Sequence, residues 1–247
     1  MTTAHKINWT SSTWNPVTGC SRVSEGCQHC YAERMAKRLQ AMGVKKYRNG
    51  FEVTPHLDAL DEPLRWRKPR IIFVNSMSDL FHEKIPLDYI RKIFDVIWAA
   101  DRHVFQVLTK RAERMAELAH RLDWPPNLWM GVTVEAQRYT GRIDLLREIP
   151  APVRWLSMEP LLTAVPELDL TDINWVVVGG ESGPGARSMK REWVYQIRSA
   201  CRRQKAAFFF KQWGGVNKKK TGRLLDNQLY NEMPPLPDST AQCSLEL

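Results

Sequence analysis

From residue 71 to residue 79 the chain reads Ile-Ile-Phe-Val-Asn-Ser-Met-Ser-Asp, an apolar run that passes directly into polar residues. Its first four residues are all β-branched or aromatic, which is typical of a strand buried on both faces. The polar residues that follow predict a loop at the carboxyl end of this strand. Because the pattern recurs along the chain, we infer the fold from its repetition.

Further strands are expected wherever this composition returns, and a first strand is expected near residues 15–18. The recurring runs span residues 104–108, 128–132, 153–156, 175–178 and 207–210. Amphipathic stretches with helical spacing occupy residues 32–42, 86–98, 111–122 and 193–201. Strands that alternate with helices predict βαβ units and a parallel sheet. The predicted fold class is therefore α/β, a partial or distorted (β/α) barrel of six to seven strands.

The length of 247 residues suits one large core. We expect residues 1–215 to form a single barrel-like domain with an insertion at about 44–69, followed by a basic segment and a disordered tail at 216–247. No uncharged apolar stretch approaches the roughly 20 residues that a membrane span needs. The protein is therefore expected to be cytoplasmic, with no membrane partner.

The balance of charge is basic. The chain has 36 Lys and Arg residues against 27 Asp and Glu residues, a formal net charge of +9. Such a protein attracts anions, so nucleic acid, a nucleotide or phosphate are candidate ligands. Solubility alone is the alternative explanation of this charge.

Three of the five cysteines lie close together, in the stretch Gly-Cys-Ser-Arg-Val-Ser-Glu-Gly-Cys-Gln-His-Cys-Tyr at residues 19–31. Cys20, Cys27 and Cys30 form a C-x6-C-x2-C pattern. A C-x2-C pair places two thiolates on one tight loop, and the third can fold back to the same centre, as a soft metal or an iron–sulfur cluster requires. Cys201 falls in the apolar stripe of a predicted helix and Cys243 in the tail, so neither is expected to be a ligand.

Three interpretations of these cysteines stay open on the residues alone. They could be unpaired structural thiols. They could bind a structural zinc, which wants four protein ligands and would need His29 or His56 as the fourth. They could hold a four-iron cluster with one open iron, which needs no fourth protein ligand.

Polar or glycine residues follow six of the predicted strands. Carboxyl ends of parallel strands meet at one edge of a sheet, where ligands gather in such folds. Helix capping or loop solvation is the alternative for each set taken singly. The sets are Asn75, Ser76, Ser78 and Asp79; Thr109, Lys110 and Arg111; Thr133 and Glu135; Ser157 and Glu159; Gly179, Gly180, Glu181, Ser182 and Gly183; and Lys211, Gln212 and Trp213.

Four segments resemble a phage-related family of unknown function, and the similarity runs over about residues 7–215. The segments are Trp-Asn-Pro-Val-Thr-Gly-Cys at 14–20, Cys-Gln-His-Cys-Tyr-Ala-Glu-Arg at 27–34, Phe-Val-Asn-Ser-Met-Ser-Asp-Leu-Phe at 73–81 and Val-Gly-Gly-Glu-Ser-Gly at 178–183. That family is grouped with the radical S-adenosylmethionine enzymes, whose usual motif is C-x3-C-x2-C with an aromatic residue before the last cysteine. This chain departs in its longer first gap and in having His29 at the aromatic position.

The resemblance implies a [4Fe-4S] cluster bound by Cys20, Cys27 and Cys30, with S-adenosyl-L-methionine as the second cofactor. It also implies a three-Cys-motif partner protein. The residues expected to bind the cofactor are His29, Ser76, Asp79, Glu135, Glu159, Gly179, Gly180 and Glu181. Those expected to bind the substrate or an anion are Lys110, Arg111 and Lys211. No catalytic residue is assigned.

The leading hypothesis is an iron–sulfur enzyme of radical S-adenosylmethionine type that acts on nucleic acid or a nucleotide. The rival is a zinc-containing nucleic-acid-binding protein without catalysis. It would use the same cysteines, the Arg-Trp-Arg-Lys segment at 65–68 and the lysine run at 218–220. That rival leaves the six polar strand ends unexplained.

The cysteine pattern generates a test by mutation. Replacing Cys20, Cys27 or Cys30 with alanine should abolish bound iron, because each removes one of three ligands. Cys201→Ala and Cys243→Ala are the matched controls and should keep the wild-type iron content. Iron per chain, measured after anaerobic purification, decides the outcome, and iron retained in Cys27→Ala would show that the ligands are assigned wrongly.

Overall fold

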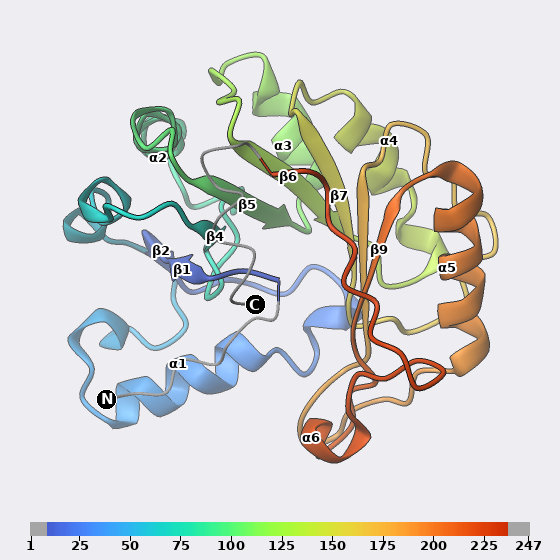
Figure 1. Ribbon diagram of the computed structural model, residues 1–247. Coiled ribbons are helices and arrows are strands. Elements are labelled where there is room, and N and C mark those ends of the chain that lie inside the picture. Colours follow the sequence, from blue (N-terminus) through green and yellow to red (C-terminus); the bar gives the residue numbers. More distant parts are fainter. Residues whose placement is uncertain (1–8, 237–247) are drawn as a thin grey trace.

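A seven-stranded parallel sheet forms the centre of the computed structural model, which describes residues 9–236 (Figure 1). The strand order is β1-β4-β5-β6-β7-β8-β9, so each crossover leads to the neighbouring strand and the sheet curls into a partial barrel. The strands are β1 Ser12–Trp14, β4 Ile71–Val74, β5 Val104–Thr109, β6 Leu128–Thr133, β7 Val153–Met158, β8 Trp175–Gly179 and β9 Ala207–Gln212. The predicted α/β partial barrel is confirmed.

All six apolar runs of the sequence are strands of this sheet, but the predicted position of the first strand is wrong. β1 ends at Trp14, and the expected segment at 15–18 instead contains β2 (Val17–Thr18), which pairs antiparallel with β3 (Thr54–Pro55) in a separate small sheet. Pro16 lies between β1 and β2 and has no N–H group to donate to a continuing ladder.

The helices are α1 Tyr31–Ala41, α2 Leu87–Ala99, α3 Ala112–Ala119, α4 Gly141–Arg147 and α5 Arg191–Gln204, with a short α6 at Lys218–Thr221. Helices α2 to α5 pack against the outer face of the sheet, whereas α1 packs in a separate cluster with Tyr47 and Met77 (Figure 1). Short 3-10 helices occur at η1 Glu25–Cys27, η2 Lys45–Tyr47, η3 Leu57–Ala59, η4 Pro63–Arg65 and η5 Gln137–Tyr139. No helix within residues 9–236 is long and apolar enough to cross a membrane.

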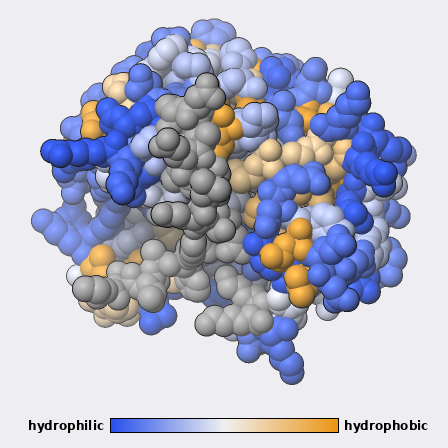
Figure 2. Space-filling view, in the orientation of Figure 1, coloured by the Kyte–Doolittle hydropathy of each residue, from blue (hydrophilic) through white to orange (hydrophobic). Residues whose placement is uncertain are grey.

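Most residues of the predicted helical stripes are buried or partly buried, but the last residues of two stretches, Met42 and Trp98, are exposed, Met42 by 56%. Ile90, Ile93 and Ile97 of α2 are fully buried, and Cys201 of α5 is a core residue. Trp98, expected in the buried stripe of α2, is 41% exposed, and its indole N–H donates a hydrogen bond to the carbonyl of Asp123. The face seen in Figure 2 is mostly hydrophilic, and its hydrophobic side chains form small separate groups.

The inner face of the sheet is filled by aromatic side chains. The indole of Trp9 packs edge-on against Phe73, Trp155 and Trp175, with ring centroids 4.9 to 5.7 Å apart. Aromatic pairs of this geometry are favourable beyond the area that they bury. This aromatic plug, formed by Trp9, Phe73, Trp129, Trp155, Trp175 and Phe209, fills the amino-terminal part of the partial barrel. Polar residues lie at the carboxyl ends of the strands.

The final described segment runs along the free edge of β9. Phe209 and Asn231 form an antiparallel bridge, and the amide of Phe210 donates a hydrogen bond to the carbonyl of Tyr230. The indole N–H of Trp175 donates to the carbonyl of Glu232. The division of the chain at residue 215 stays a prediction, and Cys243 and the end of the expected tail lie outside the described residues.

The aromatic plug predicts the cost of one small change. A Cβ added at Gly131 in β6 would lie 2.4 Å from Cε2 of the buried Trp155. Gly131→Ala should therefore lower the free energy of unfolding by about 1–3 kcal/mol, since the packed indole cannot move aside. Gly141→Ala in α4, with no atom within 4 Å of the added Cβ, is the control and should be neutral or stabilising. Urea unfolding measures both, and equal stability of the two variants would contradict the prediction.

Candidate functional site

The loop between β2 and α1, residues 19–30, lies against the carboxyl ends of the strands (Figure 1). It carries all three clustered cysteines and is called the cysteine loop below. Three side-chain clusters hold it there, centred on Glu135, Arg111 and Glu181. Each of these residues follows a strand of the sheet, so the barrel itself fixes the position of the loop.

Glu135 follows β6 and is completely buried. One carboxylate oxygen accepts hydrogen bonds from Ser24 of the cysteine loop and from Lys110, whose Nζ lies 2.6 Å away. The other oxygen accepts from Nη1 of Arg142 at 2.8 Å. Burial would raise the pKa of Glu135, but Lys110, Ser24 and Arg142 together hold it below its usual value. The carboxylate is therefore ionised, and both of its oxygens are engaged by the protein.

The close packing of the cysteine loop on this carboxylate depends on Gly26. A Cβ at this position would lie 2.5 Å from Oε1 of Glu135. No larger residue fits without displacing either the loop or the buried ion cluster. The absence of a side chain at Gly26 therefore allows the cysteine loop to pack closely against the end of β6.

Arg111, after β5, contacts the beginning of the cysteine loop. Its guanidinium donates to Sγ of Cys20 at 3.6 Å and to Oγ of Ser21 at 2.8 Å. The same group pairs with Asp79 at 3.4 Å and with Glu83 at 3.1 Å. Burial, with a contribution from Asp79, raises the pKa of Cys20 to about 12, although Arg111 opposes that rise. Arg111 is thus held in place from two sides and touches one of the three expected ligands.

Asp79 organises the turn that follows β4. Its carboxylate accepts hydrogen bonds from Oγ1 of Thr109 at 2.7 Å and from the amide of Lys110 at 3.0 Å. It also accepts from the amide of Phe81, two residues on, as in local turns of Asp and Asn. Asp79 therefore links the ends of β4 and β5.

Glu181, after β8, holds the far end of the cysteine loop through His29. Nδ1 of His29 lies 3.1 Å from Oε2 of Glu181. The guanidinium of Arg187 donates to both oxygens of Glu181, at 2.5 and 2.9 Å. Burial alone would raise the pKa of Glu181, but the hydrogen bonds from Arg187 and His29 lower that pKa to about 2.

Glu159 forms a separate cluster at the ends of β7 to β9. It accepts from Nζ of Lys211 at 2.5 Å and from Nε2 of Gln212 at 3.2 Å, and Gln212 also donates to Oγ of Ser182. A Cβ on neighbouring Gly179 would lie 3.2 Å from the carboxyl carbon of Glu159. Lys211 and Glu159, expected in different roles, therefore form one ion pair.

Two further expected residues have clear local roles. Oγ of Ser76 donates to Oδ1 of Asn15 at 3.1 Å, and its carbonyl accepts from the hydroxyl of Tyr31. A Cβ at Gly180 would lie 2.0 Å from the carbonyl oxygen of Trp213, so only glycine allows the segments after β8 and β9 to touch.

The three thiols are free and partly exposed. Within residues 9–236, no group of three or more Cys, His, Asp or Glu side chains is gathered closely enough to hold a metal ion as the side chains stand. The donor set itself, three soft sulfur atoms on one loop and none in a disulfide, is nevertheless the set that iron–sulfur clusters use. The chemistry of these residues therefore fits such a cluster.

The histidines considered as a fourth zinc ligand have other contacts. His56 shares a hydrogen bond of 2.8 Å with Oγ1 of Thr18. His29 contacts Glu181 through Nδ1, and its Nε2 lies 3.3 Å from the position of a Cβ on Gly185. Neither histidine joins the three thiols in a cluster of metal-binding geometry within the part of the chain that the structure describes.

Sequence reasoning missed three residues that build the site: Ser24, Arg142 and Arg187. Ser24 lies within the quoted cysteine stretch, where a hydroxyl between two cysteines could have suggested an anchor. Arg142 belongs to α4, a helix that was not predicted. Arg187 closely follows the glycine run at 179–185, and only its charge could have suggested a partner for Glu181.

The depressed pKa of Glu181 predicts a pH-dependent contribution to stability. Its value of about 2 in the folded protein lies below the ordinary 4.5, so the contribution is complete above pH 4.5 and is lost as pH falls toward 2. Glu181→Gln should cost on the order of 2 kcal/mol at pH 7 and progressively less below pH 4.5. Urea unfolding at several pH values measures the difference. Glu117→Gln, at an exposed site of α3, is the control, and a cost for Glu181→Gln that did not change with pH would refute the assignment.

Comparison with known proteins gives a family and similar structures. Spore photoproduct lyase with bound AdoMet and dinucleoside spore photoproduct is 13% identical, covers 76% of this chain and 60% of its own, and has a TM-score of 0.45. A complex of spore photoproduct lyase with dinucleoside spore photoproduct is 11% identical, covers 75% of this chain and 59% of its own, and has a TM-score of 0.44. This chain thus spans about 60% of the length of that first enzyme chain. No curated protein sequence matches it. Residues 4–234 match the family described as "Protein of unknown function (DUF5131)", and because this match covers most of the chain, the protein belongs to that family.

Proposed function

We propose that the protein is an iron–sulfur enzyme of radical S-adenosylmethionine type that acts on nucleic acid or a nucleotide. One observation carries this proposal. Three free thiols lie on a single loop, and that loop is held against the polar carboxyl ends of a parallel partial barrel by Glu135, Arg111 and Glu181. Ligands of such folds bind at this end of the sheet.

In this proposal Cys20, Cys27 and Cys30 hold a [4Fe-4S] cluster with one open iron. When bound, such a cluster supplies the electron that cleaves S-adenosylmethionine. The cofactor would lie among His29, Ser76 and the polar ends of β4 to β8. His29 lies between Cys27 and Cys30 in sequence, directly before Cys30, and its ring is fixed by Glu181. It would contact the cofactor from a defined direction.

The residues around the cysteine loop would contribute in two ways. The fixed ion clusters of Glu135 and Glu181 hold the loop in place, so its position needs little rearrangement on binding. The inner aromatic plug closes the barrel below the site, which would limit the access of water from that side. Both properties suit a reaction with a reactive intermediate.

The class of substrate is inferred from charge. The net charge of +9 and the cations Lys110 and Arg111 beside the cysteine loop favour an anionic substrate such as nucleic acid or a nucleotide. The single domain of residues 1–215, a cytoplasmic location and a three-Cys-motif partner protein remain part of the proposal.

The zinc-binding alternative has less support. A structural zinc wants four protein ligands, and His29 and His56 are engaged with Glu181 and Thr18. Stoichiometric zinc in colourless, fully folded protein would decide for this alternative.

The experiment that tests the proposal uses anaerobically purified, reconstituted protein. It should be brown with about four irons per chain and, with a strong reductant, should convert S-adenosylmethionine to methionine and 5′-deoxyadenosine. His29→Ala should keep its iron and show a weaker spectral response to S-adenosylmethionine. We would abandon the proposal if the reduced protein gave neither a spectral response nor any 5′-deoxyadenosine.

A further inference from the structure

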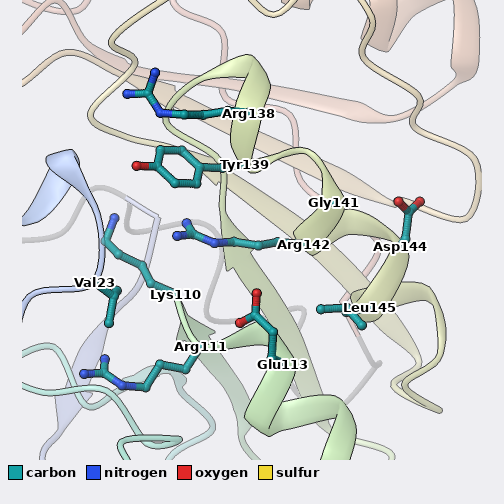
Figure 3. Close-up of a pocket in the computed structure, with 10 residues that line it drawn as sticks. All are labelled: Val23, Lys110, Arg111, Glu113, Arg138, Tyr139, Gly141, Arg142, Asp144 and Leu145. Atoms are coloured by element: carbon teal, nitrogen blue, oxygen red, sulfur yellow. The ribbon is translucent and has the colours of Figure 1, made fainter.

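A cavity of about 550 Å³ opens beside the cysteine loop, between the segment after β5 and helix α4 (Figure 3). Its volume lies within the roughly 300–1,000 Å³ that is usual for small-molecule sites. The lining residues that matter for its chemistry are Val23, Lys110, Arg111, Arg138, Tyr139 and Arg142. Because Val23 belongs to the cysteine loop and Arg111 contacts Sγ of Cys20, the cavity adjoins the proposed cluster site.

The walls of this cavity carry charged groups of both signs. Four lining residues are cations, each also paired with a carboxylate, and two, Glu113 and Asp144, are carboxylates. Asp144 is paired with Arg147, one helical turn away, at 2.5 Å. Its negative charge is therefore partly neutralised from outside the cavity. An anion would be bound by the N–H groups of these cations that the carboxylates do not engage.

Arg142 is oriented in advance for such a ligand. It is buried, and its Nη1 group is fixed by the carbonyl of Thr133 at 2.7 Å and by Glu135 at 2.8 Å. No hydrogen-bond partner for its Nε or Nη2 occurs among residues 9–236. Tyr139 lies between the guanidinium groups of Arg142 and Arg138, 4.4 and 5.2 Å from its ring centroid (Figure 3). This stacking limits the rotation of both arginines.

The cationic groups approach the same space from two elements. Figure 3 shows Lys110 extending from the segment after β5 and Arg142 extending toward it from α4, while Arg138 lies on the other side of the Tyr139 ring. A guanidinium presents paired N–H donors whose spacing matches two oxygens of a phosphate, and an ammonium adds a point charge. A phosphate group between these walls would meet donors from both sides.

We propose that this cavity binds the phosphate groups of the nucleotide or nucleic acid on which the protein acts. The identity of the ligand rests on the proposed function, whereas the presence of an anion site rests on the cavity alone. Lys110 and Arg142 also hold Glu135, which in turn holds Ser24 of the cysteine loop. A phosphate bound by Lys110 or Arg142 is therefore connected to the cysteine loop through Glu135.

The test measures binding of a fluorescein-labelled single-stranded decanucleotide to the full-length protein by anisotropy. Arg138→Glu should weaken binding about tenfold or more, because it replaces a cation that lines the cavity with a negative charge. Arg121→Glu, an equal change of charge at an exposed site beyond the far end of α3, should weaken it less than about twofold. Arg138→Gln should reduce the slope of log affinity against log salt by about one.

A second control separates the cavity from an ion pair on its rim. Arg138 also pairs with Glu25 of the cysteine loop. Glu25→Gln breaks that pair but keeps the cation, so it should bind the decanucleotide as tightly as wild type or more tightly. Weaker binding by Glu25→Gln, equal to that of Arg138→Gln, would overturn the proposal in favour of an effect through the loop.

Competitors identify the source of the phosphate. Displacement of the decanucleotide by adenosine monophosphate, but not by adenosine, supports a site for a single nucleotide. Failure of the monophosphate to displace it, with the Arg138→Glu effect intact, supports a strand with several phosphates. Equal weakening by Arg138→Glu and Arg121→Glu, or no weakening by Arg138→Glu, overturns the proposal. Iron content and 5′-deoxyadenosine release, recorded on the same samples, show separately whether the proposed function fails.

Discussion

The buried carboxylate of Glu135 is the constraint on which the site depends. An ionised carboxylate withdrawn from water is costly unless charged and hydrogen-bonding partners surround it. Lys110, Arg142 and Ser24 supply those partners from the end of β5, from α4 and from the cysteine loop. Removing any one of them would leave charge buried without full compensation. The cluster therefore fixes three separate segments in one arrangement at the end of β6.

The two ends of the barrel are stabilised by different interactions, apolar packing at the amino end and ion pairs at the carboxyl end. At the amino end, Trp9, Trp129, Trp155 and Trp175 fill the inner face, and the absence of a side chain at Gly131 makes room for one indole. At the carboxyl end, charged side chains form ion pairs, as Glu159 after β7 and Lys211 of β9 do. Apolar packing thus supports the sheet, and ion clusters then organise the loops that it carries.

Much of the fold could be predicted from the sequence because a parallel strand is buried on both faces. Such strands, Ile71–Val74 and Trp175–Gly179 among them, read as continuous apolar runs. The strand β1, which reads Ser-Thr-Trp, lacks that signal and was misplaced. The seven-residue helix α4 gave too short a pattern to be recognised. The polar strand ends could be located, but the partners of each charge, such as Arg187 for Glu181, depend on loop geometry that periodicity does not encode.

The segment along β9 has a consequence for how molecules of this protein meet one another. A partial barrel has two open edges, and an unpaired edge offers a row of N–H and C=O groups to strands of other chains. Hydrogen bonds between the 230–232 region and Phe208 and Phe210 occupy that row on β9. The opposite edge belongs to β1, which has only three residues. Neither edge offers a long free template for intermolecular sheet extension, so an open barrel is protected against edge-to-edge aggregation.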